Sequence, residues 1–195
     1  MKPAVFMDRD GTINEEVGYV NHISRFAILP GAIAAVKAIN EAGVLAVVVS
    51  NQSGVARGYF PESLVTKINQ SLRRELENGG AALDGIYYCP HLKEGRVEPY
   101  NIDCECRKPK AGMLRKAAAD LDIDLSRSYV VGDRVNDVVL AHRGGLKGVL
   151  TLTGYGRGEA EYVLPQSSVK PDFIAEDLSD AVRWILADLK NAAAG

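Results

Sequence analysis

The chain has few cysteines and no long hydrophobic run. Its longest apolar stretch, Val44–Val49, is far too short to span a bilayer. The N-terminus runs straight into apolar residues, without the basic segment, apolar core and small-residue cleavage site of a signal peptide, which favours a cytoplasmic protein. The net charge of −2 gives no reason to expect nucleic acid or an anionic membrane as a partner.

The chain also has no linker rich in Pro, Gly or Ser, no internal repeat and no low-complexity tract. Its 195 residues, 47% hydrophobic and 25% charged, are typical of one soluble domain with a core of ordinary size. We expect residues 1–190 to form that domain and residues 191–195 to form a frayed tail. No long exposed apolar stripe stays unassigned, which favours a monomer.

Apolar runs alternate with helical patterns along the chain. The expected strands are Ala4–Met7, Val44–Val49, Ile86–Tyr88, Tyr129–Val131, Gly148–Thr153 and Phe173–Ile174. The expected helices are Ala32–Ala42, Pro61–Asn78, Gly112–Leu121, Asn136–Arg143 and Leu178–Lys190. This alternation predicts an α/β fold with a doubly wound, mainly parallel sheet. The glycine-rich segment 154–158 is expected to be mobile.

Polar residues follow the ends of three expected strands. Asp8 and Asp10 come after the first, Ser50 after the second and Asp133 after the fourth. Parallel strands bring these ends to one edge of a sheet, where such folds bind ligands. Carboxylates that hold Mg²⁺, together with Lys108, suit a phosphoryl group. Taken alone, the first pair could also be an Asp-Gly turn after a strand.

All three cysteines lie in one short region. Cys89, Cys104 and Cys106, together with His91, supply the ligand set of a structural zinc site. An odd count confined to one loop argues against a disulfide framework. Each ligand pair is separated by one residue, which is tighter than usual, and the alternative is small buried thiols with a surface histidine. The loop of residues 89–106 is too polar to hold itself together, which favours zinc.

Four segments in order resemble the motifs of the haloacid-dehalogenase-like (HAD) superfamily of phosphatases. They are Asp8–Thr12, Ser50, Lys108 and Gly132–Asp137. The resemblance covers nearly the whole chain and implies a Rossmann-like fold. It implies that Asp8 is the nucleophile and that Asp10 is the acid and then the base. It also implies that Mg²⁺ is bound by Asp8, the Asp10 carbonyl and Asp133.

The same resemblance assigns roles to three further residues. Ser50 donates to a phosphoryl oxygen, and Lys108 neutralises charge there. Asp137 orients Lys108 or metal-bound water rather than binding the metal. The competing interpretations are a turn-capping serine, a solvated lysine and an acid that complements a helix N-terminus.

The cysteine loop narrows the family. Cys-Pro-His at 89–91 and Cys-Glu-Cys-Arg-Lys-Pro at 104–109 resemble the D-glycero-D-manno-heptose 1,7-bisphosphate phosphatases and the related histidinol-phosphate phosphatases. Segments 8–14, 18–20, 50–58 and 84–91 carry the same similarity. It implies removal of the 7-phosphate from a heptose bisphosphate, on the route to lipopolysaccharide or other surface-glycan precursors. The alternatives are a histidinol-phosphate or broader sugar-phosphate phosphatase, and a non-catalytic zinc-stabilised binding module.

The subfamily resemblance also implies which residues contact the phosphorylated sugar. They are Glu16, Val17, Gly18, Tyr19, Asn51, Gln52, Ser53, Arg107 and Arg134. Arg107 is expected to hold the distal part of the substrate, because a guanidinium matches phosphate geometry with a rigid fork. The alternative for Arg107 is a solvated charge, and for Tyr19 a packing role. The intervals between the motifs leave room only for loops and helices, so we expect an exposed site without a large cap domain.

Overall fold

One parallel sheet of six strands organises the computed structural model, which describes residues 1–194 and the side chains of residues 1–192. The strands are β1 (Ala4–Met7), β2 (Leu45–Asn51), β3 (Gly85–Cys89), β4 (Tyr129–Gly132), β5 (Lys147–Thr151) and β6 (Phe173–Ala175). Their order across the sheet is β3-β2-β1-β4-β5-β6, and every neighbouring pair is parallel. The predicted α/β fold is confirmed.

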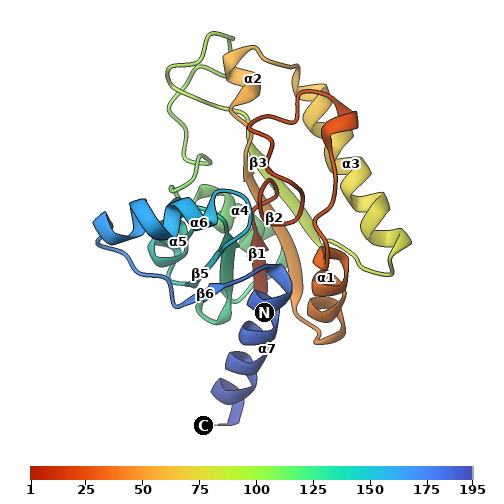
Figure 1. Ribbon diagram of the computed structural model, residues 1–195, viewed down its shortest axis with the longest axis vertical. Helices are drawn as coiled ribbons and strands as arrows, with labels where there is room; N and C mark the ends of the chain where they lie inside the picture. Colours follow the sequence, from red (N-terminus) through yellow and green to blue (C-terminus); the bar gives the residue numbers. More distant parts are fainter. Residues whose placement is uncertain (195) are drawn as a thin grey trace.

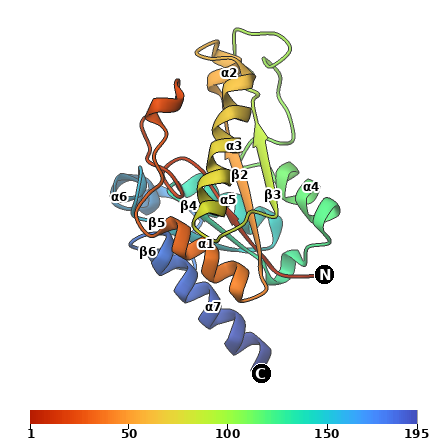
Figure 2. The ribbon, with the colours of Figure 1, turned by 90° about the vertical axis from the view of Figure 1, so that its right-hand side faces the viewer.

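Helices cover both faces of this sheet (Figures 1 and 2). They are α1 (Ala32–Glu41), α2 (Gly54–Arg57), α3 (Glu62–Asn78), α4 (Gly112–Leu121), α5 (Val135–Gly144), α6 (Gly156–Gly158) and α7 (Leu178–Ala194). Helices α1, α3 and α7 pack on one face, and α4 and α5 pack on the other. The sheet is therefore doubly wound, as predicted.

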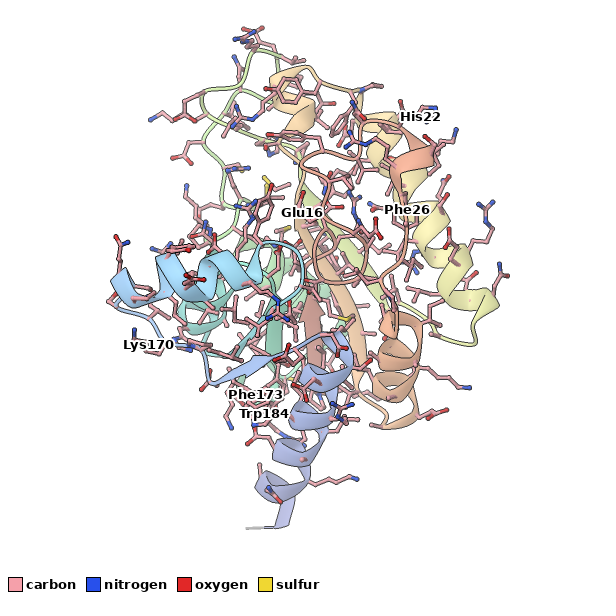
Figure 3. All side chains as sticks on the ribbon, viewed as in Figure 1. Glu16, His22, Phe26, Lys170, Phe173 and Trp184 are labelled. Carbon is pink, nitrogen blue, oxygen red and sulfur yellow. The ribbon has the colours of Figure 1, made fainter. Side chains whose placement is uncertain are left out.

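The central strand β1 shows why its residues are apolar without alternation. Val5 and Met7 lie in the core cluster on the α1 side, whereas Ala4 and Phe6 lie in the cluster on the α4 side. Successive side chains of a strand point to opposite faces, so a strand covered on both sides needs apolar residues at every position. On the α1 side, Phe173 and Trp184 stack with ring centroids 5.1 Å apart and join β6 to α7 (Figure 3).

Two expected segments differ from the structure. Helix α7 continues to Ala194 instead of ending at Lys190, and Gly195, part of the predicted tail, lies outside the described residues. The segment expected to be mobile instead begins a run of helical turns, in which α6 leads into a π-helical turn (Glu159–Val163) and a 3-10 turn (Leu164–Gln166). Leu164 packs with Val135 and Leu150, which anchors these turns to α5 and β5.

The described residues contain no large cap domain. Between β1 and α1 the chain forms a loop with one 3-10 turn (Ile23–Arg25), and between β3 and α4 it forms the extended cysteine loop. Both lie above the carboxyl ends of the strands, beside α2 (Figure 1). No helix in residues 1–194 is long and apolar enough to cross a membrane.

Candidate active site

The candidate site lies where the order of the strands reverses, next to β1. From β1 the chain proceeds outward to β2 and β3, and it then returns to β4 on the other side of β1. The loops after β1 and β4 therefore diverge and leave a crevice at the carboxyl edge, the usual ligand site of such sheets. Asp8 follows β1 and Asp133 follows β4, so the topology brings these two acids together.

Lys108 lies between two carboxylates in the crevice. Its Nζ is 2.9 Å from Asp8 Oδ2 and 2.7 Å from Asp137 Oδ1, and the lysine is only 6% exposed. Burial alone would lower the pKa of Lys108, but the two negative charges outweigh it and raise that pKa. The Arg134 amide donates to the other Asp137 oxygen over 3.2 Å, so both oxygens of Asp137 have partners. These contacts fit the expected role of Asp137, which is to orient Lys108.

Asp133 has the features of a metal ligand. Its Oδ2 accepts a hydrogen bond of 2.8 Å from the Tyr155 amide, whereas its Oδ1 is buried without a partner. Burial, followed by the charge of Asp8, raises the pKa of Asp133 to about 8. Oxygens of Asp8, Asp133 and Asp137 lie within 4.8 Å of one another. An unpartnered oxygen in an acidic cluster fits a hard cation such as Mg²⁺, which takes carboxylate ligands.

The loop after β1 approaches the Asp133 carboxylate so closely that a glycine is required. Gly11 has φ +83°, and a Cβ at this position would collide with the Asp133 carboxylate. The conformation and the lack of space both exclude larger residues. The Asp-Gly pair therefore does form a turn, and the turn is part of the site.

Asp10 is held by a buried arginine that the sequence analysis overlooked. Arg9 is 1% exposed, and its Nη2 lies 3.0 and 2.9 Å from the two Asp10 oxygens. Arg9 Nη1 donates to Asn69 of α3 over 2.9 Å. Burial raises the pKa of Asp10, but the Arg9 charge and hydrogen bonds from Asn14 and Gln52 more than offset it and leave that pKa below its usual value. Asp10 is therefore ionised in the free protein.

Replacement of Arg9 by Met is expected to destabilise the protein by about 3 kcal/mol, because it leaves the partly buried carboxylate of Asp10 without its charged partner. Urea unfolding measures the change. Arg183→Met is the matched control, since Arg183 is 73% exposed and pairs with Asp180 at the surface, where ion pairs contribute about 1 kcal/mol or less. Equal stability of the two variants would contradict the role of Arg9.

Two predicted substrate residues are engaged with the site itself. Gln52 Nε2 donates to Asp10 Oδ2 over 2.8 Å and to Ser50 Oγ over 3.0 Å. The Asn51 amide group exchanges hydrogen bonds of 3.0 and 3.2 Å with the backbone of Lys108. Both residues border the pocket, and both also fix catalytic candidates in place.

A pocket of about 320 Å³ opens from these groups. The predicted residues that line it are Asp8, Asp10, Glu16, Gly18, Tyr19, Ser50, Asn51, Gln52, Ser53, Arg107, Lys108, Arg134 and Asp137. Glu16 lies near the middle of the molecule, on the chain that follows β1 (Figure 3). Val17 is not among the lining residues, and its carbonyl accepts a hydrogen bond from Arg25. The lining residues that sequence analysis did not assign are Val20, Arg57, Phe60, Asn136 and Tyr155.

The cysteine loop brings its four predicted ligands together. The three Sγ atoms are 3.0, 3.2 and 3.3 Å apart, and His91 Nδ1 is 3.3 Å from Cys106 Sγ and 3.7 Å from Cys89 Sγ. Sulfurs of a disulfide would be about 2.05 Å apart, and those of a filled tetrahedral zinc site about 3.8 Å, given Zn–S bonds of about 2.3 Å. A hydrogen bond from Cys89 lowers the pKa of Cys106 to about 5, which favours the thiolate that metals bind. The donor set fits zinc, and the sulfurs are too far apart for a disulfide.

Arg107 connects this cluster to the pocket. It follows Cys106 directly, it lines the pocket, and its Nη1 donates to the His91 carbonyl over 3.1 Å. Two cluster residues therefore hold the backbone and the side chain of Arg107. A metal in the cluster would fix the direction of this guanidinium.

Comparison with known proteins gives the family. A HAD-hydrolase-like model matches residues 105–181. The D-glycero-D-manno-heptose-1,7-bisphosphate 7-phosphatase of Thermosynechococcus vestitus is 43% identical over 192 residues, which cover 96% of this chain and 97% of the relative. The D-glycero-beta-D-manno-heptose-1,7-bisphosphate 7-phosphatase of Haemophilus ducreyi is 43% identical, over 94% of this chain and 98% of the relative. The chain belongs to this family of HAD phosphatases.

The family is also found among solved structures. The D,D-heptose 1,7-bisphosphate phosphatase of B. bronchiseptica, complexed with magnesium and phosphate, has a TM-score of 0.82 and 32% identity. The match covers 96% of this chain and 99% of that structure. The superfamily and subfamily resemblance stated from the motifs is confirmed. The chain is a HAD phosphatase, and thus a phosphoric monoester hydrolase, in a family whose phosphatases generally use Mg²⁺.

Proposed function

We propose that the protein removes the 7-phosphate of D-glycero-D-manno-heptose 1,7-bisphosphate in a magnesium-dependent reaction through an aspartyl-phosphate. The product, heptose 1-phosphate, is a precursor for lipopolysaccharide or other surface polysaccharides. The relatives named for this activity match 96% and 94% of the chain. The residue roles, the Mg²⁺ and Zn²⁺ assignments, the single domain over residues 1–190, the monomeric state and the cytoplasmic location are all part of this proposal.

The positive charge of the arginines that line the pocket supports this choice of substrate. Three arginines, Arg57, Arg107 and Arg134, line it in addition to Lys108. One phosphoryl group at Asp8 needs Lys108, which leaves three guanidinium groups for a second anionic group, such as the 1-phosphate. Histidinol phosphate has no second phosphate and carries an ammonium group, which these arginines would repel. The geometry therefore favours a sugar bisphosphate.

In the first half-reaction the Asp8 carboxylate forms a bond to phosphorus as the bond from phosphorus to the sugar oxygen breaks. Asp10 gives its proton to that oxygen. Asp10 takes this proton from solvent before the reaction, because the phosphate dianion beside Asp10 raises the pKa of Asp10 and outweighs the effect of Arg9. Ser50 donates a hydrogen bond to the phosphoryl group, and Lys108 neutralises charge there.

In the second half-reaction Asp10 takes a proton from water. The water oxygen bonds to phosphorus, the bond to Asp8 breaks, and inorganic phosphate leaves. Asp8, Asp133 and the Asp10 carbonyl would hold the magnesium, which, when bound, reduces the repulsion between the carboxylate and the phosphate.

Phosphate release in Mg²⁺ from both heptose 1,7-bisphosphate anomers and from histidinol phosphate tests the substrate. We expect kcat/KM to be about 10²-fold larger for a heptose bisphosphate, because a site built for a charged group discriminates against a ligand without it. Phosphorus NMR of the product should show heptose 1-phosphate. A larger kcat/KM for histidinol phosphate, or release of the 1-phosphate, would overturn the proposal.

A further inference from the structure

The segment after β5, from Thr153 to Glu159, is attached to the site at three points. Thr153 Oγ1 donates to the Gly11 carbonyl over 2.6 Å, and the Tyr155 amide donates to Asp133 Oδ2 over 2.8 Å. The Val135 amide donates to Glu159 Oε2 over 2.8 Å. Gly154 lets the chain pass the Asp133 carboxylate, since a Cβ there would collide with it. The backbone of Tyr155 is thus fixed beside the loop that carries Arg134.

The ring of Tyr155 lies under the guanidinium of Arg134. The Arg134 Cζ is 3.9 Å from the ring centroid, well within the range of a cation–π contact. Both side chains line the pocket, and Tyr155 is 41% exposed. Within residues 1–192, Arg134 has no carboxylate partner at salt-bridge distance. The ring therefore directs the guanidinium and leaves its N–H donors available to a ligand.

We propose that Tyr155 is a positioning residue that holds Arg134 ready to bind the distal, non-reacting phosphate of a bisphosphorylated sugar. This inference rests on the proposed function, because it names the group that the arginine binds. An arginine in water loses side-chain freedom when it binds a ligand, and a ring that already fixes its orientation reduces that loss. The distal phosphate takes no part in the bond changes at Asp8. We expect its contacts to be equally strong in the bound substrate and in the transition state, so that their loss raises KM and leaves kcat unchanged.

Substitutions of the ring separate this role from that of the backbone. The Tyr155 amide, which donates to Asp133, is present in every variant. Tyr155→Phe keeps the ring, whereas Tyr155→Leu removes it. Tyr162→Leu is the matched control, because Tyr162 is 64% exposed and lies outside the pocket lining.

The test measures heptose 1,7-bisphosphate hydrolysis and, as a substrate with one phosphate, p-nitrophenyl phosphate. Tyr155→Leu is expected to raise KM for the bisphosphate about fivefold, with kcat within about twofold and the KM for p-nitrophenyl phosphate within about twofold. Tyr155→Phe, which keeps the ring, should have the same KM for the bisphosphate as the wild type. In an Arg134→Gln background, Tyr155→Leu should have no further effect on KM. Equal effects of Tyr155→Leu on both substrates, or a full effect without Arg134, would overturn the inference.

A second measurement separates this inference from the proposed substrate. Fructose 1,6-bisphosphate is used as a competitive inhibitor of p-nitrophenyl phosphate hydrolysis. Its inhibition constant should rise about fivefold in Tyr155→Leu, while that of inorganic phosphate stays within about twofold. A wild type inactive on the heptose bisphosphate would refute the proposed function alone. An unchanged inhibition constant for the bisphosphate would refute the role of Tyr155 alone.

Discussion

Asp8→Asn is expected to lower phosphate release about 10⁶-fold, because an amide cannot form the phosphoryl intermediate. The fold should persist. Asn has nearly the shape of Asp, and the change removes one of three acids, Asp8, Asp133 and Asp137, that lie within 4.8 Å of one another. Steady-state phosphate release measures the loss, and thermal unfolding checks the fold.

Asp122→Asn is the control for this prediction. Asp122 lies away from the pocket with φ 52°, a conformation that Asn accepts, and its side chain is 80% exposed. Activity of Asp122→Asn should equal that of the wild type. If Asp8→Asn kept an activity near that of the wild type, the covalent role of Asp8 would be excluded.

Loss of the zinc site is expected to have the second largest effect, on stability. Metal analysis should find about one zinc per chain that resists mild chelation. Cys104→Ala should lower the melting temperature by about 10 °C, because structural zinc contributes several kcal/mol and each kcal/mol shifts a domain of this size by about 2–4 °C. KM for the bisphosphate should also rise, since Arg107 donates to the carbonyl of His91, one of the proposed zinc ligands.

The control substitution lies next to the same ligand. Asp103→Ala removes an exposed partner of Lys110, and such surface pairs contribute about 1 kcal/mol or less. Two results together would rule out the structural site. They are a wild-type protein without zinc, and equal melting temperatures for Cys104→Ala and Asp103→Ala. Mild chelation should instead stop turnover by removing magnesium, and added Mg²⁺ should restore it.

Much of the fold follows from local patterns. The β-branched run that becomes β2 and the apolar residues of β1 predict strands covered on both faces, and the acids after β1 and β4 predict where the site lies. The four cysteine-loop ligands also come together as their composition predicts. The roles of the acids stay a prediction, since geometry alone does not test chemistry.

Other features depend on long-range contacts that periodicity does not reveal. Arg9 sits between two acids, where an arginine is usually solvated, and it is buried because Asn69 of α3, 60 positions later, accepts its free N–H. The available signal was Asn69, a polar residue among the mostly apolar buried residues of α3. Helix α2, which carries Arg57, has four residues and is too short for any periodic pattern.

The glycines after β5 have a different structural role from the one that their pattern indicated. Gly154 and Gly156 suggested mobility, but a Cβ at these positions would meet the Asp133 carboxylate and the Thr151 carbonyl. They are there because two segments pass in close contact. A sequence cannot distinguish these two uses of glycine without knowing what lies opposite.

The order of the strands places phosphate hydrolysis and sugar recognition in different parts of the sheet, so that sequence changes can affect one without the other. The acids proposed to carry out the reaction follow β1 and β4 at the middle of the sheet, whereas the cysteine loop begins at the end of β3, an edge strand. An insertion or exchange within that loop alters the outer rim of the pocket without disturbing the pairing of the central strands. Closely related enzymes could thus diverge in the sugar they accept while the hydrolytic apparatus stays the same.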